Sequence, residues 1–140
     1  MVADSVDGVP ILHLSLPVTD LESSREFYVD VLGCAAGQVG DFGMDVWFYG
    51  LQLTLQVHPD QVLPDDRQGV RHFGVTLERT ALDALLARLQ EQPVRWISPV
   101  TTDTDGTLRG KTSAKLADPS GNVIELKTYD DPDAALGRPR

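Results

Sequence analysis

Apolar and polar residues alternate along several short stretches of the chain, a pattern with the two-residue period of β-strands. Residues 11–18 place leucines on one face and His13 on the other, and residues 51–58 alternate strictly in the same way. Residues 70–78 repeat the first pattern, with Phe73 and Val75 opposite His72. Further predicted strands are residues 45–49, 94–98, 111–117 and 122–129.

Two stretches have the spacing of amphipathic helices instead. The first is predicted to start at a cap formed by Thr19 or Asp20 and to end at Gly33. The second is predicted to start at a Thr80 cap and to end before Pro93. The apolar stripe of the second helix consists of Leu82, Leu85, Leu86 and Leu89.

The order of these elements repeats along the chain, which indicates two similar modules. Each half reads as strand, helix and then two or three strands, so each is a small sheet with a helix on one face. We expect a flexible N-terminus (1–10), a single α+β domain (11–129) and a C-terminal tail (130–140). Within the domain, module one (11–58) is joined to module two (70–129) by a proline-punctuated linker (59–69).

A turn near the end of the chain places a carboxylate in the middle of a strand. Pro119 and Gly121 favour a tight turn, and the strand that follows alternates, with Glu125 on its polar face. The histidines of the two first strands also lie opposite the apolar face. Residues His13, Gln56, His72 and Glu125 therefore converge if the two sheets curl together. Imidazole and carboxylate ligands suit a divalent ion, so this set predicts a metal site.

Composition narrows the choice of partners. The 140 residues suffice for one domain with a sizeable core. Net charge is −9, with no basic stripe, which argues against nucleic acid and an anionic membrane surface. Cys34 is the single cysteine, and we see neither a signal-peptide pattern nor a run of ~18 apolar residues. We therefore expect a cytoplasmic protein that acts on a small molecule.

The motifs resemble those of the vicinal oxygen chelate superfamily, which includes glyoxalase I, bleomycin resistance proteins and extradiol dioxygenases. The matching stretches are His13 in ILHLSLPVTDLESSREFYVDVLG, His72 in RHFGVTLE and Glu125 in LADPSGNVIELKTY. The resemblance implies two βαβββ modules whose curled mixed sheets surround a metal-binding cavity. It also implies that these three residues bind one divalent ion (Fe, Mn, Co, Ni or Zn), with Gln56, or Thr54 in the other register, as the fourth ligand.

The resemblance further implies a reaction. A metal that binds two neighbouring substrate oxygens acts as a Lewis acid and stabilises an enolate-like intermediate, which suits a lyase, isomerase or epimerase, with Glu125 as a candidate base. The alternatives are a single-domain Fe(II) extradiol-type dioxygenase and a metal-free, drug-sequestering protein. Candidate substrate-binding residues are Trp47, Thr54, Lys127, Tyr129 and Arg109, the last on a loop (101–110) that is a candidate lid. We expect a homodimer, in which modules of two chains can share a site.

Overall fold

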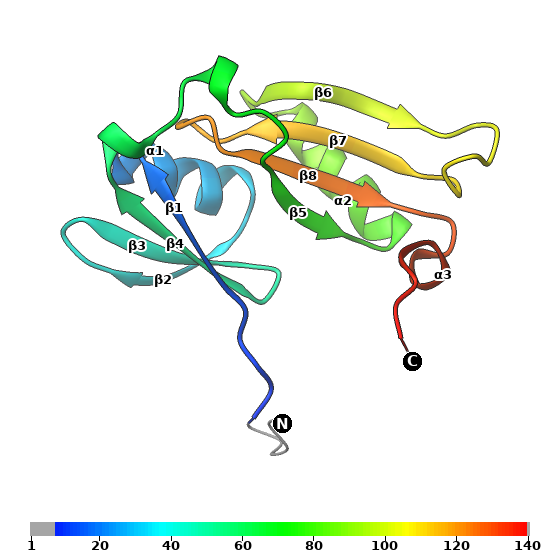
Figure 1. Cartoon of the computed structure of the whole chain (residues 1–140), viewed down its shortest axis with the longest axis horizontal. Helices are drawn as coiled ribbons and strands as arrows, with labels where there is room; N and C mark the ends of the chain where they lie inside the picture. Colours follow the sequence, from blue (N-terminus) through cyan, green and yellow to red (C-terminus); the bar gives the residue numbers. More distant parts are fainter. Residues whose placement is uncertain (1–7, 140) are drawn as a thin grey trace. The chain divides into compact units, whose positions relative to one another are not determined.

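The computed structural model describes residues 8–139, which form two compact units that divide after Val62 (Figure 1). This boundary falls inside the expected linker. The expectation of a flexible N-terminus concerns residues 1–10, of which 1–7 lie outside the described residues.

The first unit is one βαβββ module. Its sheet, sheet A, consists of β1 (His13–Val18), β2 (Ala35–Val39), β3 (Gly43–Phe48) and β4 (Leu51–Val57) in the order β1-β4-β3-β2. Strand β1 runs parallel to β4, and the other neighbours are antiparallel. The α1 helix (Leu21–Arg25) continues as a π-helical segment, η1 (Glu26–Val31), and a short 3-10 turn, η2 (Pro59–Gln61), follows β4.

The second unit repeats this topology. Sheet B consists of β5 (Phe73–Thr76), β6 (Arg95–Thr102), β7 (Thr112–Ala117) and β8 (Val123–Thr128) in the order β5-β8-β7-β6, with β5 parallel to β8. Before it lies η3 (Asp65–Arg67), and α2 (Arg79–Gln90) connects β5 to β6. Two four-stranded mixed sheets with few helices confirm the predicted α+β fold.

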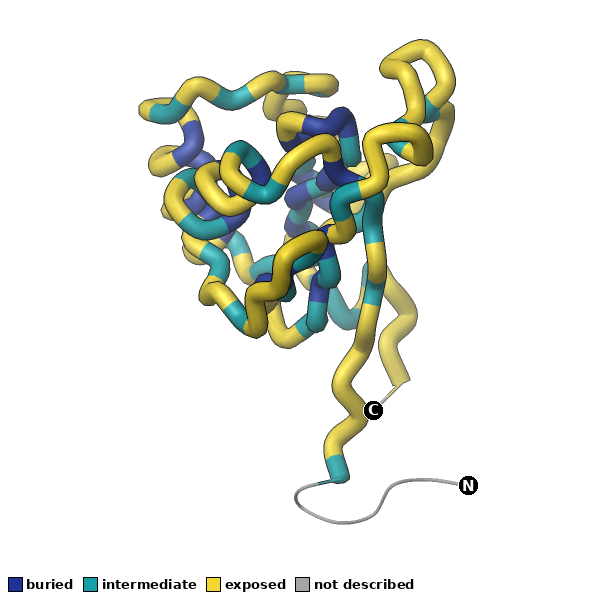
Figure 2. Tube along the Cα trace, turned by 90° about the vertical axis from the view of Figure 1, so that its left-hand side faces the viewer, coloured by how far each residue is buried: buried dark blue, intermediate teal, exposed yellow. Residues whose placement is uncertain are grey.

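Each sheet buries the face that carries its apolar residues. The buried residues are dark blue along the trace in Figure 2. In unit one these residues include Val46, Leu53 and Leu55, and Phe27 and Tyr28 of η1 are also buried. In unit two, Ile124 and Leu126 are buried, as are the four leucines of the predicted stripe on α2. The opposite face of each sheet, called here its open face, carries the polar positions of the strands, because neighbouring side chains alternate between faces.

Several element boundaries differ from the predictions. Strand β1 begins at His13 rather than at residue 11, and Leu12 is 70% exposed. Helix α2 begins at Arg79 without a side-chain cap, so the predicted Thr80 cap is wrong. Strand β6 runs through Pro99, where the pairing with β7 shifts register. A bulge leaves residues unpaired, so it tolerates a proline that has no N–H to donate.

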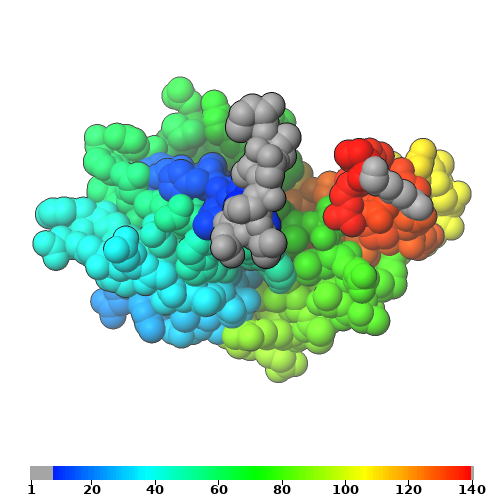
Figure 3. Space-filling view, turned by 90° about the horizontal axis from the view of Figure 1, so that it is seen from below, coloured from blue at the N-terminus to red at the C-terminus, as the bar shows by residue number. Residues whose placement is uncertain are grey.

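The C-terminal region also contains regular structure. Residues Pro132–Leu136 form α3, capped by the Asp131 side chain and ended by Gly137 in the left-handed conformation. In the space-filling view this red segment lies against the orange residues of the same unit (Figure 3). No helix among residues 8–139 has both the length and the apolar character needed to cross a membrane.

Candidate metal centre

Glu125 lies on the open face of sheet B and has three basic side chains near its carboxylate. Strand β8 holds it opposite Gly74 of β5 and Lys115 of β7. Only 12% of its side chain is exposed, and two ammonium groups lie close to the carboxylate. The Nζ atom of Lys111 is 3.6 Å from Oε2, and that of Lys127 is 3.8 Å from Oε1. The Glu125 side chain is therefore mostly buried, with an ammonium group close to each of its two oxygens.

His72 lies just before β5 and reaches the same carboxylate. Its Nδ1 atom is 2.7 Å from the carbonyl oxygen of Val70, and its Nε2 atom is 3.9 Å from Oε1 of Glu125. A carbonyl oxygen only accepts hydrogen bonds, so Nδ1 is the protonated nitrogen. In the neutral ring, Nε2 then carries the free lone pair, and this nitrogen faces the Glu125 carboxylate.

His13 has the same arrangement at the start of β1. Its Nδ1 atom is 3.2 Å from the carbonyl oxygen of Gln52 on the parallel neighbour β4. Histidines that ligate metals typically donate their other ring N–H to a backbone carbonyl or carboxylate, which fixes the tautomer. The two histidines at equivalent positions of the repeat thus both present Nε2 as the metal-binding atom.

The donor set suits a divalent ion. Metal bonds to imidazole nitrogen and carboxylate oxygen measure about 2.0–2.2 Å, so two atoms 3.9 Å apart, as in His72 and Glu125, can share one ion. His13 belongs to the other unit. Within either unit as described, no three His, Cys, Asp or Glu side chains gather closely enough to form a complete site.

The open face of sheet A carries a hydrogen-bonded cluster without cations. Thr54 Oγ1 donates to Asp45 Oδ1 at 2.6 Å, and Gln52 Nε2 donates to Asp45 Oδ2 at 3.2 Å. Gln56 donates from its amide to the Ser15 hydroxyl. Asp45, whose facing could not be assigned from the sequence, thus shares a face with Thr54 and Gln52.

The strand registers identify which residue of sheet A corresponds to Glu125. Glu125 pairs with Gly74, two residues after His72. On sheet A, the residue two positions after His13 is Ser15, and Ser15 pairs with Thr54. Thr54 is therefore the counterpart of Glu125 in the repeat, and Gln56, two positions further along, stays a predicted ligand.

The remaining predicted residues have varied surroundings. Trp47 pairs with Gln52 across β3 and β4 and is partly exposed. Tyr129 lies beside Lys127, whose Nζ is 3.4 Å from the phenol oxygen and 5.5 Å from the ring centre. Arg109 does not approach Glu125, because its Nη1 atom donates to the carbonyl oxygen of Ala134 in α3.

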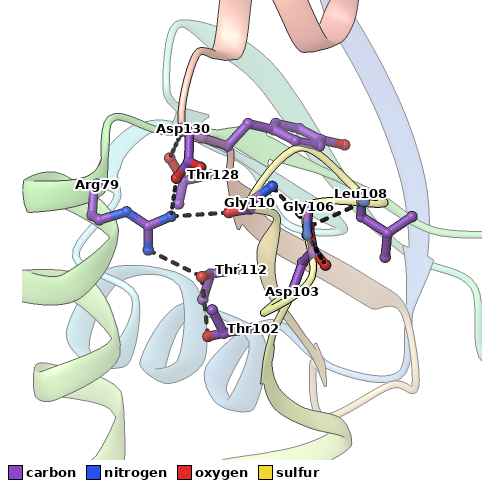
Figure 4. Close-up of polar contacts among 10 residues, drawn as sticks. Arg79, Thr102, Asp103, Gly106, Leu108, Gly110, Thr112, Thr128 and Asp130 are labelled. Carbon is purple, nitrogen blue, oxygen red and sulfur yellow. Dashed lines mark hydrogen bonds and ion pairs between the residues drawn. The ribbon is translucent and has the colours of Figure 1, made fainter.

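A polar network fixes the loop that precedes Lys111 (Figure 4). The carboxylate of Asp103 accepts hydrogen bonds from the amides of Gly106, Leu108 and Gly110. Arg79 donates to the Gly110 carbonyl and to the Thr112 hydroxyl, both at 3.0 Å.

Its guanidinium also lies 3.6 Å from the carboxylate of Asp130 (Figure 4). The expected lid is therefore held to the sheet, and its end positions Lys111 beside Glu125. Sequence reasoning missed Lys111, Gln52 and Arg79, because their contacts come from strand pairing and loop closure.

The single cysteine, Cys34, is free and half-buried. Burial raises the pKa of the Cys34 thiol to about 11, far above physiological pH. Burial, and secondarily Cys34, also raise the pKa of the nearby Tyr49. The thiolate is the reactive form of cysteine, so the raised pKa disfavours reaction at Cys34.

Comparison with known proteins agrees with the fold and the motifs. The family model described as Glyoxalase/Bleomycin resistance protein/Dioxygenase superfamily matches residues 10–126. A metallothiol transferase FosB of Lysinibacillus sphaericus is 29% identical over 118 residues, covering 84% of this chain and 81% of its own. The FosB of Staphylococcus saprophyticus is 27% identical, covering 84% and 76%. A glyoxalase/bleomycin resistance protein/dioxygenase structure from Alicyclobacillus acidocaldarius has a TM-score of 0.82 at 26% identity, covering 91% and 96%.

Proposed function

Because the chain belongs to the glyoxalase/bleomycin resistance protein/dioxygenase superfamily, we propose that it is a divalent-metal-dependent enzyme acting on a small molecule with neighbouring oxygens. The ligands are His13, His72 and Glu125, with Gln56 or Thr54 beside them. The observation that carries this proposal is the matched pair of histidines, each with Nδ1 bound to a main-chain carbonyl. When bound, the ion supplies Lewis acid polarisation of a substrate oxygen.

The substrate is anionic. All three lysines of the chain, Lys111, Lys115 and Lys127, belong to β7, β8 or the residue before β7. Two of them contact Glu125, and the third pairs with it across the strands. A divalent ion bound to Glu125 would offset its negative charge, which would leave the ammonium groups available to an anionic substrate. Tyr129 adds a hydroxyl beside Lys127.

The favoured reaction is transfer of a thiol to this substrate. The curated relatives whose matches cover 84% of this chain carry the name metallothiol transferase. We take the thiol to be a separate reactant, because burial raises the pKa of the Cys34 thiol to about 11 and so disfavours its thiolate. Residues of sheet B then orient the anionic acceptor while the thiol sulfur forms a bond to one of its carbons. The carbon–oxygen bond at that carbon breaks, and the released oxygen, which stays on the acceptor, takes up the proton that the thiol loses.

A second candidate is proton transfer next to a carbonyl, as in a lyase, isomerase or epimerase. The observation that favours it is the position of Glu125 between two ammonium groups. A Glu125 carboxylate that leaves the metal can accept a proton from the substrate, and the lysines can stabilise the negative charge that develops on the substrate oxygen.

We further propose that the protein acts as a homodimer whose sites are shared between chains. The support is the repeat, in which each unit contributes one histidine, at the start of β1 or just before β5. Two chains related by a two-fold axis would form two identical sites of this kind.

Metal analysis tests the proposal. We expect about one divalent ion per chain in the purified protein. His13→Ala, His72→Ala and Glu125→Gln should each weaken Mn²⁺ binding by at least about tenfold, the lower end of what even an outer-shell change costs. His58→Ala is the matched control, because His58 is the third histidine of the chain and is exposed at the end of β4.

Equal metal affinity in all four variants would contradict the ligand assignment, and a wild type that binds no metal would favour a drug-sequestering protein. In the loaded enzyme, thiol consumption that survives Cys34→Ser supports thiol transfer. Solvent deuterium that enters the product would support proton transfer instead. Oxygen uptake with Fe(II) would identify a dioxygenase.

A further inference from the structure

A cavity of unit two lies beside the proposed metal ligand His72, which is part of its lining. It measures about 160 Å³ and is lined by residues of the segment before β5, of β6 and of β7. Its polar lining includes Arg71, His72, Arg95, Ser98 and Lys115. The mechanism proposed above assigns no role to either arginine.

The cavity concentrates positive charge in an acidic chain. Among residues 8–139, no carboxylate lies within 4 Å of the charged groups of Arg71 or Lys115. Arg95 pairs with Asp65 through one guanidinium nitrogen at 3.0 Å, which leaves its other donors for a ligand. Three cations and one carboxylate therefore line the cavity, although the whole chain has a net charge of −9.

The local backbone holds these cations in place. Arg71 donates from Nη1 to the carbonyl oxygen of Gln68 at 3.3 Å, and both residues line the cavity. Gly121, at a positive φ of 87°, also lines the cavity. A Cβ atom there would lie 3.1 Å from the Asp65 carboxylate and 3.3 Å from the Gln68 amide, so this close approach favours glycine.

The cavity is small and adjoins a second one through His72. Pockets for drug-sized ligands measure about 300–1,000 Å³, so a volume of about 160 Å³ suits one chemical group rather than a whole molecule. The neighbouring cavity of about 210 Å³ is lined by Thr76, Glu125 and Lys127. His72 lines both.

We propose that the cavity binds a small anionic group, of the carboxylate or phosphate class, carried by the second reactant of the enzyme. The inference rests on the proposed function, in which His72 binds the metal and the thiol is a separate molecule. Arginine guanidinium groups bind carboxylates and phosphates through parallel hydrogen bonds. An anionic group bound by Arg71 and Arg95 leaves the rest of the reactant next to His72, where the acceptor binds.

Anion titration of the full-length protein tests this proposal. Inorganic phosphate and malonate, as the phosphate and dicarboxylate probes, are titrated at constant ionic strength, and amide chemical shifts are followed by NMR. We expect saturable shifts at Gly69, Ser98 and Gly121. Saturation by one probe identifies the class of the group, and saturation by neither overturns the proposal.

Variants locate the binding site. Arg71→Gln and Arg95→Gln should each weaken binding by about tenfold or more, as expected for loss of a charge-assisted hydrogen bond. Arg25→Gln is the matched control, because it removes the same charge from an exposed ion pair of unit one. Equal affinities in the three variants, or shifts confined to Lys111 and Lys127, would overturn the assignment.

Mn²⁺ binding distinguishes the two proposals. Arg71→Gln should retain wild-type Mn²⁺ affinity while it loses phosphate or malonate binding, which supports a separate anion site. A wild type that binds the anion but no Mn²⁺ supports the cavity and refutes the metal centre. A wild type that binds Mn²⁺ without a saturable anion site refutes the cavity alone.

Discussion

The open faces of the two sheets share a topology and differ in their electrostatics. On sheet A, Asp45 receives hydrogen bonds from the neutral side chains of Thr54 and Gln52. On sheet B, Glu125 is surrounded by Lys111, Lys127 and His72. Of the 12 lysines and arginines in the chain, only one precedes residue 63, whereas nine of the 21 acidic residues do.

The difference shows how one repeated module can supply two parts of a chemical site. The repeat keeps the strand order, the register and a histidine at the start of each first strand. The charged side chains around that common frame have diverged. Sheet B has the cations to bind an anion, and sheet A offers neutral donors and one carboxylate.

The largest expected effect concerns the spacing of β5 and β8. A Cβ atom on Gly74 would lie 1.9 Å from the carbonyl oxygen of Glu125, an overlap that only a backbone shift can relieve. Gly74→Ala should therefore destabilise unit two by about 3 kcal/mol, at the upper end of the usual cost of overpacking. Urea denaturation followed by Trp96 fluorescence in a Trp47→Phe background measures it, since each unit contains one tryptophan.

The equivalent position in sheet A provides the control. Ser15 has a side chain there, and its hydroxyl accepts a hydrogen bond from Gln56. Ser15→Ala should cost unit one less than about 1 kcal/mol, because the pair is exposed. A Gly74→Ala protein as stable as Ser15→Ala would show that the two sheets have the same strand spacing.

A smaller effect compares the two carboxylate clusters in the presence of EDTA. Glu125→Gln leaves Lys111 and Lys127, about a quarter exposed, without their anion, and should cost roughly 1–2 kcal/mol after allowance for solvent screening. Thr54→Val removes the 2.6 Å hydrogen bond to Asp45 and should cost about 1–2 kcal/mol.

Added salt distinguishes the loss of an ionic partner in Glu125→Gln from the loss of a hydrogen bond in Thr54→Val. Added NaCl screens charges, so it should reduce the cost of Glu125→Gln and leave the cost of Thr54→Val unchanged. Denaturation at about 0.05 and 0.5 M NaCl checks this expectation. The same salt dependence in both variants would mean that charge does not distinguish the Glu125 cluster from the Asp45 cluster.

Much of this fold could be predicted from the sequence, because strict alternation and a leucine stripe are local signals. The alternation is clear in β4 and the leucine stripe in α2, and the histidines at matching positions indicated the repeat. The length of β6 could not be predicted, since Pro99 ends a regular strand and only a register shift against β7 permits it.

For the candidate site, the sequence predicted on which face of its strand each residue lies, but not which residues lie opposite one another. Alternation places Gln52, Thr54 and Gln56 on one face, but their order relative to His13 depends on the pairing of β1 with β4. Register is a property of two strands and cannot be read from one. The position of Lys111 likewise depends on Arg79 and Asp103, which fix a loop through contacts distant in the sequence.

The smallest predicted effect compares the helices that cover the two sheets. The Asp20 carboxylate caps α1 by accepting a hydrogen bond from the Ser23 amide at 2.8 Å, whereas α2 follows Glu78 without a side-chain cap. Asp20→Ala should therefore destabilise unit one by about 1 kcal/mol at pH 7. Glu78→Ala should change the free energy of unfolding of unit two by less than about 0.5 kcal/mol.

The effect of Asp20 should depend on pH in one direction. The backbone hydrogen bond from Ser23, followed by its hydroxyl, lowers the pKa of Asp20 below its ordinary value of 3.8. The folded state therefore favours the ionised form, so the stabilisation is complete above pH 3.8 and is lost as the pH falls through the lowered pKa. Urea denaturation at pH 7 and pH 3, followed by Trp47 fluorescence, should show the cost of Asp20→Ala shrinking at the lower pH. Asp20→Asn, which keeps an acceptor oxygen, should lose less at pH 7, and a cost of Asp20→Ala that grows on acidification would contradict the cap.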